Sequence, residues 1–158
     1  PGVGGHCVAV DPWFIVESAP EESHLIKVAR EINSTKPRVV FANVEKAIAA
    51  TGKEASELTI ACFGLSFKRD VDDLRGSPAV EIAEMIVGAG FKDVMLVEPH
   101  LDQIPTRRLF KSSRLVDSVE AISCADICVL LVDHAEFRTL DKELFRSKQV
   151  IDTRGVWA

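Results

Sequence analysis

The sequence predicts an α/β protein in which a long helical connector is followed by a small Rossmann-like domain built on a parallel sheet. Two observations support this fold class. Apolar residues recur at three- and four-residue spacing across residues 18–52, which is typical of helices with one buried face. Further along, short apolar runs without alternation are separated by segments with helix signals, which is typical of parallel strands covered on both faces. The chain therefore divides into residues 1–17, 18–52 and 53–158.

The first fifty residues predict a loop and then two helices. Residues 2–11 are rich in glycine and predict a loop that leads into the apolar run 13–16. A helix start is then indicated by a serine N-cap, a first-turn proline and a capping-box glutamate: Ser18, Pro20 and Glu21. Pro37 is expected to end or kink that helix. A second helix runs to about residue 50, and Gly52 suits the left-handed position just past its end.

The remaining elements alternate between strands and helices. Four short apolar runs predict strands: Leu58–Phe63, Val94–Val97, Ile127–Val132 and Val150–Ile151. Three helices are expected between or after them: Ser77–Gly88, Ser118–Ser123 and Glu136–Arg146. The segment from about Asp102 to Leu115 is polar, and no element is predicted there. The fingerprint Gly-x-Gly-x-x-Gly is absent after the first strand, so we expect that this domain does not hold a dinucleotide alone.

The composition argues against several classes of protein. A net charge of −5 is unlike that of nucleic-acid-binding proteins, which usually carry a basic excess. The longest apolar run, near Ile127–Val132, is too short to span a bilayer. No charged leader precedes an apolar stretch, so no secretory signal is visible. We therefore expect a cytoplasmic protein with neither nucleic acid nor membrane as a partner.

Four cysteines are expected to be free thiols in a reducing compartment: Cys7, Cys62, Cys124 and Cys128. Cys62 and Cys128 lie inside apolar runs, where cysteine usually acts as a small buried hydrophobe. The chain contains no Cys-x-x-Cys pair and no histidine at zinc spacing, so no metal site is predicted. It begins with a glycine loop and without methionine, and we interpret it as a fragment of a longer protein.

A glycine loop presents the first candidate for chemistry. Cys7 follows Gly4, Gly5 and His6, and glycines let a backbone approach a ligand closely. Asp11, four residues later, could orient or deprotonate a water, or position the thiol. On spacing alone, a glycine turn with an incidental buried cysteine is an equally good interpretation.

Two later segments carry basic residues at the expected ligand-binding edge of the sheet. Residues 63–78 join the end of a strand to the start of a helix, and their Lys68 and Arg75 are placed to meet phosphate oxygens. Arg154 follows the last predicted strand and reaches the same edge. Taken singly, a solvated charged loop and a surface arginine at the chain end explain these residues as well.

Taken together, the three segments resemble the UDP-glucose/GDP-mannose dehydrogenase family in order and approximate spacing. Gly-Gly-x-Cys with aspartate four positions on, in residues 4–11, is similar to the family's nucleophile loop. Phe-Lys-x-Asp and then Arg-x-Ser-Pro, in residues 67–78, are similar to its substrate and cofactor loop. The resemblance covers essentially the whole chain. It implies a catalytic cysteine loop over 1–17, central dimerisation helices over 18–52 and a C-terminal UDP-sugar-binding domain over 53–158.

The form of the cysteine loop narrows the substrate that the resemblance implies. The runs 6–14 and 152–157 are most similar to family members that oxidise UDP-N-acetyl-D-mannosamine. Family members that act on UDP-glucose commonly have a lysine before the aspartate, whereas this chain has Val10. Two alternatives stay open. One is UDP-N-acetylglucosamine as the substrate, because its enzymes share the His-Cys loop, and the other is a non-catalytic nucleotide-binding α/β module.

The resemblance also implies a mechanism, in which a parent enzyme oxidises the sugar C6 hydroxyl to a carboxylate with two NAD⁺. The first hydride transfer gives an aldehyde, which has no good hydride to donate until a nucleophile adds to it. A thiolate adds readily and forms a thiohemiacetal, whose oxidation leaves a thioester that water hydrolyses. By this resemblance Cys7 is the nucleophile, and Asp11 assists the water or the proton traffic.

Binding residues and partners follow from the same resemblance. Three residues would contact the nucleotide sugar: Phe67, Lys68 and Arg154. Gly4 and Gly5 would let the loop approach the sugar, and Arg75 would reach the NAD pyrophosphate. His6 receives no role. A homodimer through the central helices is implied, and the fragment alone is expected not to turn over substrate, because the NAD domain with its glycine fingerprint is missing.

Other polar and aromatic residues are expected to be structural. Asp133 and His134 are interpreted as a helix N-cap and its neighbour. Four basic residues are interpreted as a solvated face: Arg107, Arg108, Lys111 and Arg114. Trp13 and Phe14 are expected to pack against the connector helix.

Overall fold

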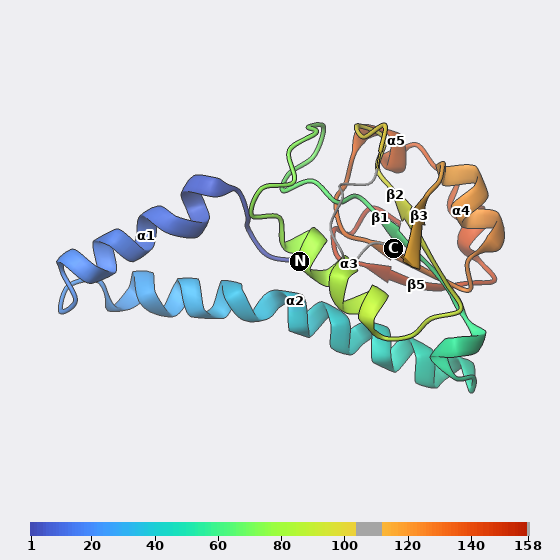
Figure 1. The fold of residues 1–158 in the computed structure, drawn as a ribbon, viewed down its shortest axis with the longest axis horizontal. Helices are drawn as coiled ribbons and strands as arrows, with labels where there is room; N and C mark the ends of the chain where they lie inside the picture. Colours follow the sequence, from blue (N-terminus) through green and yellow to red (C-terminus); the bar gives the residue numbers. More distant parts are fainter. Residues whose placement is uncertain (104–111, 158) are drawn as a thin grey trace.

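Five parallel strands, in the order β3-β2-β1-β4-β5, form the sheet of the C-terminal domain, in the right half of Figure 1. The computed structural model describes residues 1–103 and 112–157. Its strands are β1 Thr59–Phe63, β2 Asp93–Val97, β3 Ser113–Leu115, β4 Ile127–Leu130 and β5 Gln149–Asp152. The order reverses between β1 and β4, as in doubly wound folds whose ligands bind beyond the carboxyl ends of the strands.

All of the helices except the first lie against the sheet domain, and together they cover both faces of the sheet (Figure 1). The longer ones are α1 His6–Ser18, α2 His24–Thr51, α3 Pro78–Gly88 and α4 Ser118–Cys124, and the short ones are α5 Ala135–Arg138 and the 3₁₀ turns Ala55–Glu57 and Lys142–Phe145. Along β1, Ile60 and Cys62 pack with α2 and α3, whereas Ala61 and Phe63 pack with α4 and α5. Alternate residues of β1 therefore enter two hydrophobic cores, one on each face of the sheet. Because both faces are covered, the strand is apolar at every position and not at every second one.

Most of the strands and helices predicted for the sheet domain are confirmed. All four predicted strands are present, and α3 and α4 lie where helices were expected. Ser77 caps α3, because its hydroxyl accepts hydrogen bonds from the amides of Ala79 and Val80. Gly52 ends α2 with φ of 69°, the left-handed conformation that glycine adopts most readily.

The prediction of a loop over residues 2–11 is confirmed for residues 2–5 and wrong for residues 6–11. Helix α1 begins at His6, directly after Gly5, so Cys7 and Asp11 are helical residues. Its apolar residues lie on all sides and none of them is buried, so the sequence carries no amphipathic period there. Trp13 and Phe14 were expected to pack on the connector helix, but Phe14 is 64% exposed.

The connector is one helix rather than two. Helix α2 begins after Ser23 and not after Ser18, which is the last residue of α1. Pro37 lies inside α2 without ending it. Pro37 is buried, together with Val40 and Val44. Packing of this half of α2 against α3 and the sheet offsets the cost of a proline in a helix interior, which is about 3 kcal/mol.

Two further expectations need correction. The single helix expected over 136–146 is split into α5 and a 3₁₀ turn, which starts where the Asp141 carboxylate accepts the amide of Glu143. Strand β3 lies in the segment for which no element was predicted. Of the four basic residues expected on a solvated face, Arg107, Arg108 and Lys111 lie outside the described residues, and Arg114 is paired with Asp93 and Glu120.

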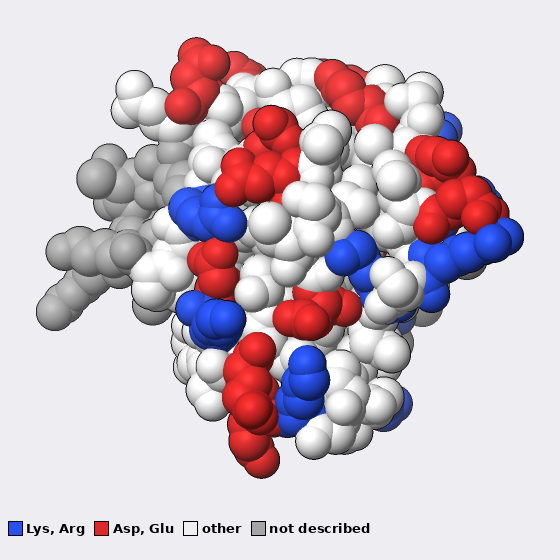
Figure 2. Space-filling model, turned by 90° about the vertical axis from the view of Figure 1, so that its right-hand side faces the viewer, with Lys and Arg blue, Asp and Glu red and all other residues white. Residues whose placement is uncertain are grey.

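None of the helices among the described residues is long and apolar enough to cross a membrane. Figure 2 shows lysine and arginine side chains interspersed with aspartate and glutamate on one face of the molecule. The described residues on this face form no continuous basic tract of the kind that follows a nucleic-acid backbone.

Gly64 ends β1 at a point where only glycine fits. Its φ is 86°, its amide donates to the carbonyl of Val97 at 2.8 Å, and an added Cβ would lie 2.4 Å from the Cβ of Val132. We expect Gly64→Ala to lower the free energy of unfolding by about 2–3 kcal/mol in urea titrations. Gly88→Ala is the matched control, because among the described residues nothing beyond its chain neighbours and the backbone of its own helix lies within 4 Å of an added Cβ there. Equal stability of the two variants would contradict the packing described.

Candidate functional site

The N-terminal glycine loop is packed directly on the loop that joins β1 to α3. The amide of Gly5 donates to the carbonyl of Gly76 at 3.1 Å. An added Cβ on Gly4 would lie 2.3 Å from that same carbonyl oxygen and 2.3 Å from Cδ of Pro78. Gly5 has φ of 105°, and an added Cβ would meet the Phe67 ring at 3.1 Å. Both glycines are therefore needed for close packing of loop on loop, and their approach to a sugar stays a prediction.

Helix α2 holds the same loop from the other side. The side-chain amide of Asn33 accepts a hydrogen bond from the amide of Val3 at 2.8 Å and donates one to the carbonyl of Val3 at 2.9 Å. A cavity of about 320 Å³ opens between this loop, α2 and the start of α3. Arg30 lines it, and the buried Nε of Arg30 has no hydrogen-bond partner among the described residues. The glycine loop is thus fixed on two sides beside a partly polar hollow.

Cys7 lies in the first turn of α1, immediately beyond the fixed loop. Its thiol is exposed, as is Asp11 one helical turn later. Residues four apart share a face of a helix, so the Cys7 and Asp11 side chains leave α1 on the same side. Cys62 and Cys128 are buried as predicted, and burial raises the pKa of each thiol to about 12. These two thiols therefore stay protonated and unreactive at neutral pH.

The loop of residues 64–78 carries three of the predicted binding residues. The amide of Phe67 donates to the carbonyl of Asp73 at 3.0 Å, which closes the loop on itself. Lys68 is exposed, with Nζ 5.5 Å from the centre of the Phe67 ring. The Arg75 side chain is 73% exposed and forms an ion pair with Asp73 at 2.7 Å. Hydrogen bonds from Arg75 lower the pKa of Asp73 to about 2, with a smaller contribution from the charge of His6.

Arg154 reaches the same end of the sheet from the C-terminal segment. The carboxylate of Asp152 accepts the amides of Arg154 and Gly155, each at 2.8 Å, and so fixes the turn after β5. The Nε of Arg154 lies 3.2 Å from Asp133. The glycine loop and the loop of residues 64–78 are therefore in direct contact, and Arg154 follows β5 at the same carboxyl edge of the sheet.

A buried polar network beneath this place was missed at the sequence level. Glu98, just after β2, accepts hydrogen bonds from the amides of Leu65 at 2.7 Å and Ser66 at 3.1 Å. Its carboxylate also lies 3.1 Å from Nε2 of His134, which follows β4. Burial opposes ionisation of Glu98, but the hydrogen bonds from His134, Leu65 and Ser66 outweigh it and lower its pKa. The carboxylate is therefore ionised at neutral pH.

This network explains why the domain differs from a dinucleotide-binding one. In such domains the backbone amides that follow the first strand face the pyrophosphate of the cofactor. Here the amides of Leu65 and Ser66 are hydrogen-bonded to the chain's own carboxylate, Glu98. An anion from outside would have to displace a buried glutamate to use them.

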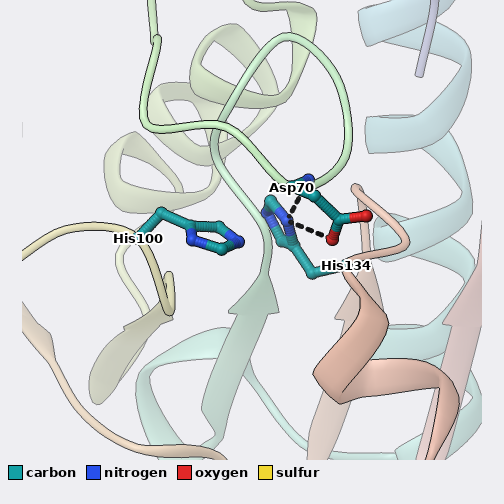
Figure 3. Close-up of side chains that lie close together, drawn as sticks. All are labelled: Asp70, His100 and His134. Carbon is teal, nitrogen blue, oxygen red and sulfur yellow. Dashed lines mark hydrogen bonds and ion pairs between the residues drawn. The ribbon is translucent and has the colours of Figure 1, made fainter.

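Asp70, His100 and His134 lie close enough to be considered as metal ligands, within 4.8 Å of one another (Figure 3). However, Nδ1 of His134 lies 2.9 Å from the amide nitrogen of Asp70, and Nε2 lies against Glu98. A metal ion would have to break one of these hydrogen bonds to gain His134 as a ligand. We therefore interpret the group as a structural anchor for the 65–70 segment.

The comparison with family models decides the family. Residues 61–158 match the UDP-binding domain of the UDP-glucose/GDP-mannose dehydrogenase family. The chain belongs to this family. The match includes the loop of residues 64–78 and Arg154, so the domain that carries these residues is the UDP-binding domain of a UDP-glucose/GDP-mannose dehydrogenase family member.

Individual relatives extend the likeness over the whole chain. The NDP-N-acetyl-D-galactosaminuronic acid dehydrogenase of Ralstonia nicotianae is 50% identical over 158 residues, which are 100% of this chain and 36% of the relative. The UDP-N-acetyl-D-mannosamine dehydrogenase of Escherichia coli K12 is 48% identical over 161 residues, covering 99% of this chain and 38% of the relative. The chain thus spans little more than a third of the length of these family members.

Solved structures of the UDP-glucose/GDP-mannose dehydrogenase family confirm the α/β fold. The UDP-D-ManNAc dehydrogenase of Pyrococcus horikoshii superposes with a TM-score of 0.80 at 30% identity, over 98% of this chain and 35% of that chain. The UDP-N-acetyl-mannosamine dehydrogenase of Staphylococcus aureus superposes with a TM-score of 0.76 at 35% identity, over 99% of this chain and 35% of that chain.

Proposed function

We propose that the chain is the C-terminal part of an NAD-dependent UDP-N-acetyl-D-mannosamine 6-dehydrogenase, in which Cys7 is the nucleophile. The observation that carries the proposal is the packing of the glycine loop on the loop of residues 64–78, which brings Cys7 to the UDP-binding domain. Relatives named UDP-N-acetyl-D-mannosamine dehydrogenase, 48% identical over nearly the whole chain, support the substrate.

The exposed thiol of Cys7 suits this chemistry. Its sulfur adds to the aldehyde carbon of the half-oxidised sugar and forms a thiohemiacetal, and the later thioester is hydrolysed by water. Asp11 lies on the same side of α1 and would orient that water or accept its proton. Lys68 and Arg154 supply positive charge for the diphosphate, and Phe67 presents an apolar ring beside Lys68.

NAD would supply the hydride acceptor for both oxidation steps. Among the described residues, Arg75 fits a contact to its pyrophosphate, because the guanidinium is largely exposed and is held through Asp73. The amides after β1 do not fit such a contact, since Glu98 already occupies them. Most of the cofactor site must therefore come from the part of the parent protein outside this chain.

A second candidate substrate is favoured by a specific comparison. The relative that is 50% identical is named an NDP-N-acetyl-D-galactosaminuronic acid dehydrogenase. UDP-N-acetylgalactosamine is therefore an alternative beside UDP-N-acetylglucosamine, which shares the acetamido group.

The proposal is tested with the full-length parent protein and its nucleotide sugars. We expect NADH formation with UDP-N-acetylmannosamine, at a kcat/KM at least roughly tenfold above the values for UDP-N-acetylglucosamine, UDP-N-acetylgalactosamine and UDP-glucose. The 158-residue chain alone is expected to give no NADH above background. Higher efficiency with another N-acetyl sugar would overturn the substrate, and binding of UDP-sugars without any oxidation would favour the non-catalytic module.

The helical hairpin supports the homodimer that we propose for the parent enzyme. In Figure 1, α1 and the first half of α2 project beyond the sheet domain. Large apolar side chains on these segments are exposed, with Leu25 82%, Phe14 64% and Ile32 55% exposed. Exposed apolar surface of this kind is typical of a protein–protein contact. Sedimentation of the full-length protein at micromolar concentration should give a dimer mass, and a monomer mass would contradict this assembly.

A further inference from the structure

We propose that His134 is a positioning residue that holds segment 65–70 in its binding conformation through the backbone amide of Asp70. The inference rests on the proposed function, in which Phe67 and Lys68 of this segment contact the nucleotide sugar. His134 lies at the start of α5, far in the sequence from segment 65–70, and its side chain is fully buried. In Figure 3 the ring lies between His100 and the backbone of Asp70.

The partners of His134 define the tautomer of its ring. Nδ1 lies 2.9 Å from the amide nitrogen of Asp70, and a backbone amide can only donate, so Nδ1 accepts. The ring proton is therefore on Nε2, which lies within 3.2 Å of both carboxylate oxygens of Glu98. Because Glu98 is ionised, it favours this tautomer over the one with the proton on Nδ1.

Glu98 and His134 together fix both ends of the segment. Glu98 accepts the amides of Leu65 and Ser66 at its start, and His134 accepts the amide of Asp70 at its end. Asp70 has φ of 58°, a conformation that costs energy in residues other than glycine. Its carboxylate accepts the amide of Ala135, directly after His134, at 2.9 Å. The strained turn is therefore held by two hydrogen bonds to the same short stretch after β4.

The segment held in this way is the one that meets the cysteine loop. Between its fixed ends lie Phe67, whose ring packs on Gly5, and the exposed Lys68. The hydroxyl of Ser66 also donates to the carbonyl of Lys68 at 2.6 Å, which shapes the backbone between the two anchors. Loss of the anchor at Asp70 would release Phe67 and Lys68 while the strands of the core remain paired.

Two amide substitutions separate the two functions of the imidazole ring. The oxygen of an asparagine side chain can take the place of Nδ1, so His134→Asn keeps an acceptor for the amide of Asp70. The amide of a glutamine side chain can take the place of Nε2, so His134→Gln keeps a donor to Glu98 and loses the anchor. Both variants lose part of a buried side chain, and they are therefore matched in their expected loss of stability.

In the full-length enzyme we expect His134→Gln to raise the KM for UDP-N-acetylmannosamine roughly tenfold, and to change the KM for NAD less than about twofold. His134→Asn should raise the sugar-nucleotide KM less than about threefold. Amide hydrogen exchange of the peptide that covers residues 64–72 should be faster in His134→Gln than in His134→Asn. All assays are run well below the unfolding temperature of each variant.

The proposed anchor would be overturned if His134→Gln and His134→Asn had the same KM for UDP-N-acetylmannosamine and the same rate of hydrogen exchange. It would also be overturned if His134→Gln raised the KM for NAD as much as the KM for the nucleotide sugar. If the wild-type enzyme oxidises none of the UDP-sugars, the proposed function fails instead. The exchange of residues 64–72 then still decides whether His134 anchors the loop, because hydrogen exchange does not depend on turnover.

Discussion

Cys7→Ser in the full-length enzyme is expected to lower kcat for uronate formation by roughly a thousandfold or more. The hydroxyl of serine stays protonated at neutral pH and is a much weaker nucleophile toward an aldehyde than a thiolate. The side chain is exposed at the start of α1, so the substitution removes the sulfur without disturbing packing. NADH formation and the uronate product are followed together, and the melting temperature should remain unchanged.

Cys124→Ser is the matched control for this variant. Cys124 is the other exposed thiol among the described residues, and it ends α4 at a distance in the sequence from all three segments of the site. We expect its activity to stay within about twofold of wild type. If the activity of Cys7→Ser stayed within tenfold of wild type, Cys7 would not be the nucleophile. Equal losses of activity in Cys7→Ser and Cys124→Ser would indicate a general effect of thiol removal.

Gly4→Ala is expected to lower kcat/KM roughly a hundredfold, with a small change in stability. The added methyl group would lie 2.3 Å from the carbonyl oxygen of Gly76 and from Cδ of Pro78, and neither group is the flexible end of a side chain. The glycine loop must therefore move away from the loop of residues 64–78 and take Cys7 with it. Because the loop lies outside both hydrophobic cores, unfolding should be affected little.

Gly88→Ala serves again as the control. Within the part of the chain that the structure describes, the added methyl group meets nothing outside its own helix backbone and chain neighbours within 4 Å, so activity should be unaffected. The displaced loop has a second signature, which is faster alkylation of Cys7 in Gly4→Ala than in wild type, measured by mass spectrometry. Normal activity of Gly4→Ala would show that the packing of loop on loop does not position the thiol.

The sheet could be predicted from the sequence because each strand is a short apolar run bounded by polar residues. Strand β1 illustrates this, since its alternate residues enter different cores and leave no polar gap in the run. Helix α1 could not be predicted in this way. None of its residues is buried among the described residues, so its apolar residues do not follow the helical period that one buried face would impose. In addition, the glycines before it predict a loop.

The candidate site could be predicted in part. The Cys7, Lys68 and Arg154 segments carry local motifs, and the resemblance placed them in one family before the fold was known. Glu98 and His134 carry no such motif, since a glutamate after one strand and a histidine after another are ordinary in sequence. Only the parallel pairing of β1 with β2 and β4 brings their side chains together beneath the loop. Such a signal is not local, so periodicity and spacing do not detect it.

The proposed mechanism requires that Cys7 forms a covalent bond to the sugar carbon during oxidation, at the edge of the UDP-binding domain. It is tested by acid quenching of the full-length enzyme during turnover with UDP-N-acetylmannosamine and NAD⁺, and by mass spectrometry of the peptides. We expect an acyl adduct of the nucleotide sugar on the peptide that contains Cys7, and more of it in Asp11→Asn, where hydrolysis of the thioester is slowed. Continued formation of the uronate by enzyme whose Cys7 is fully alkylated would contradict the account.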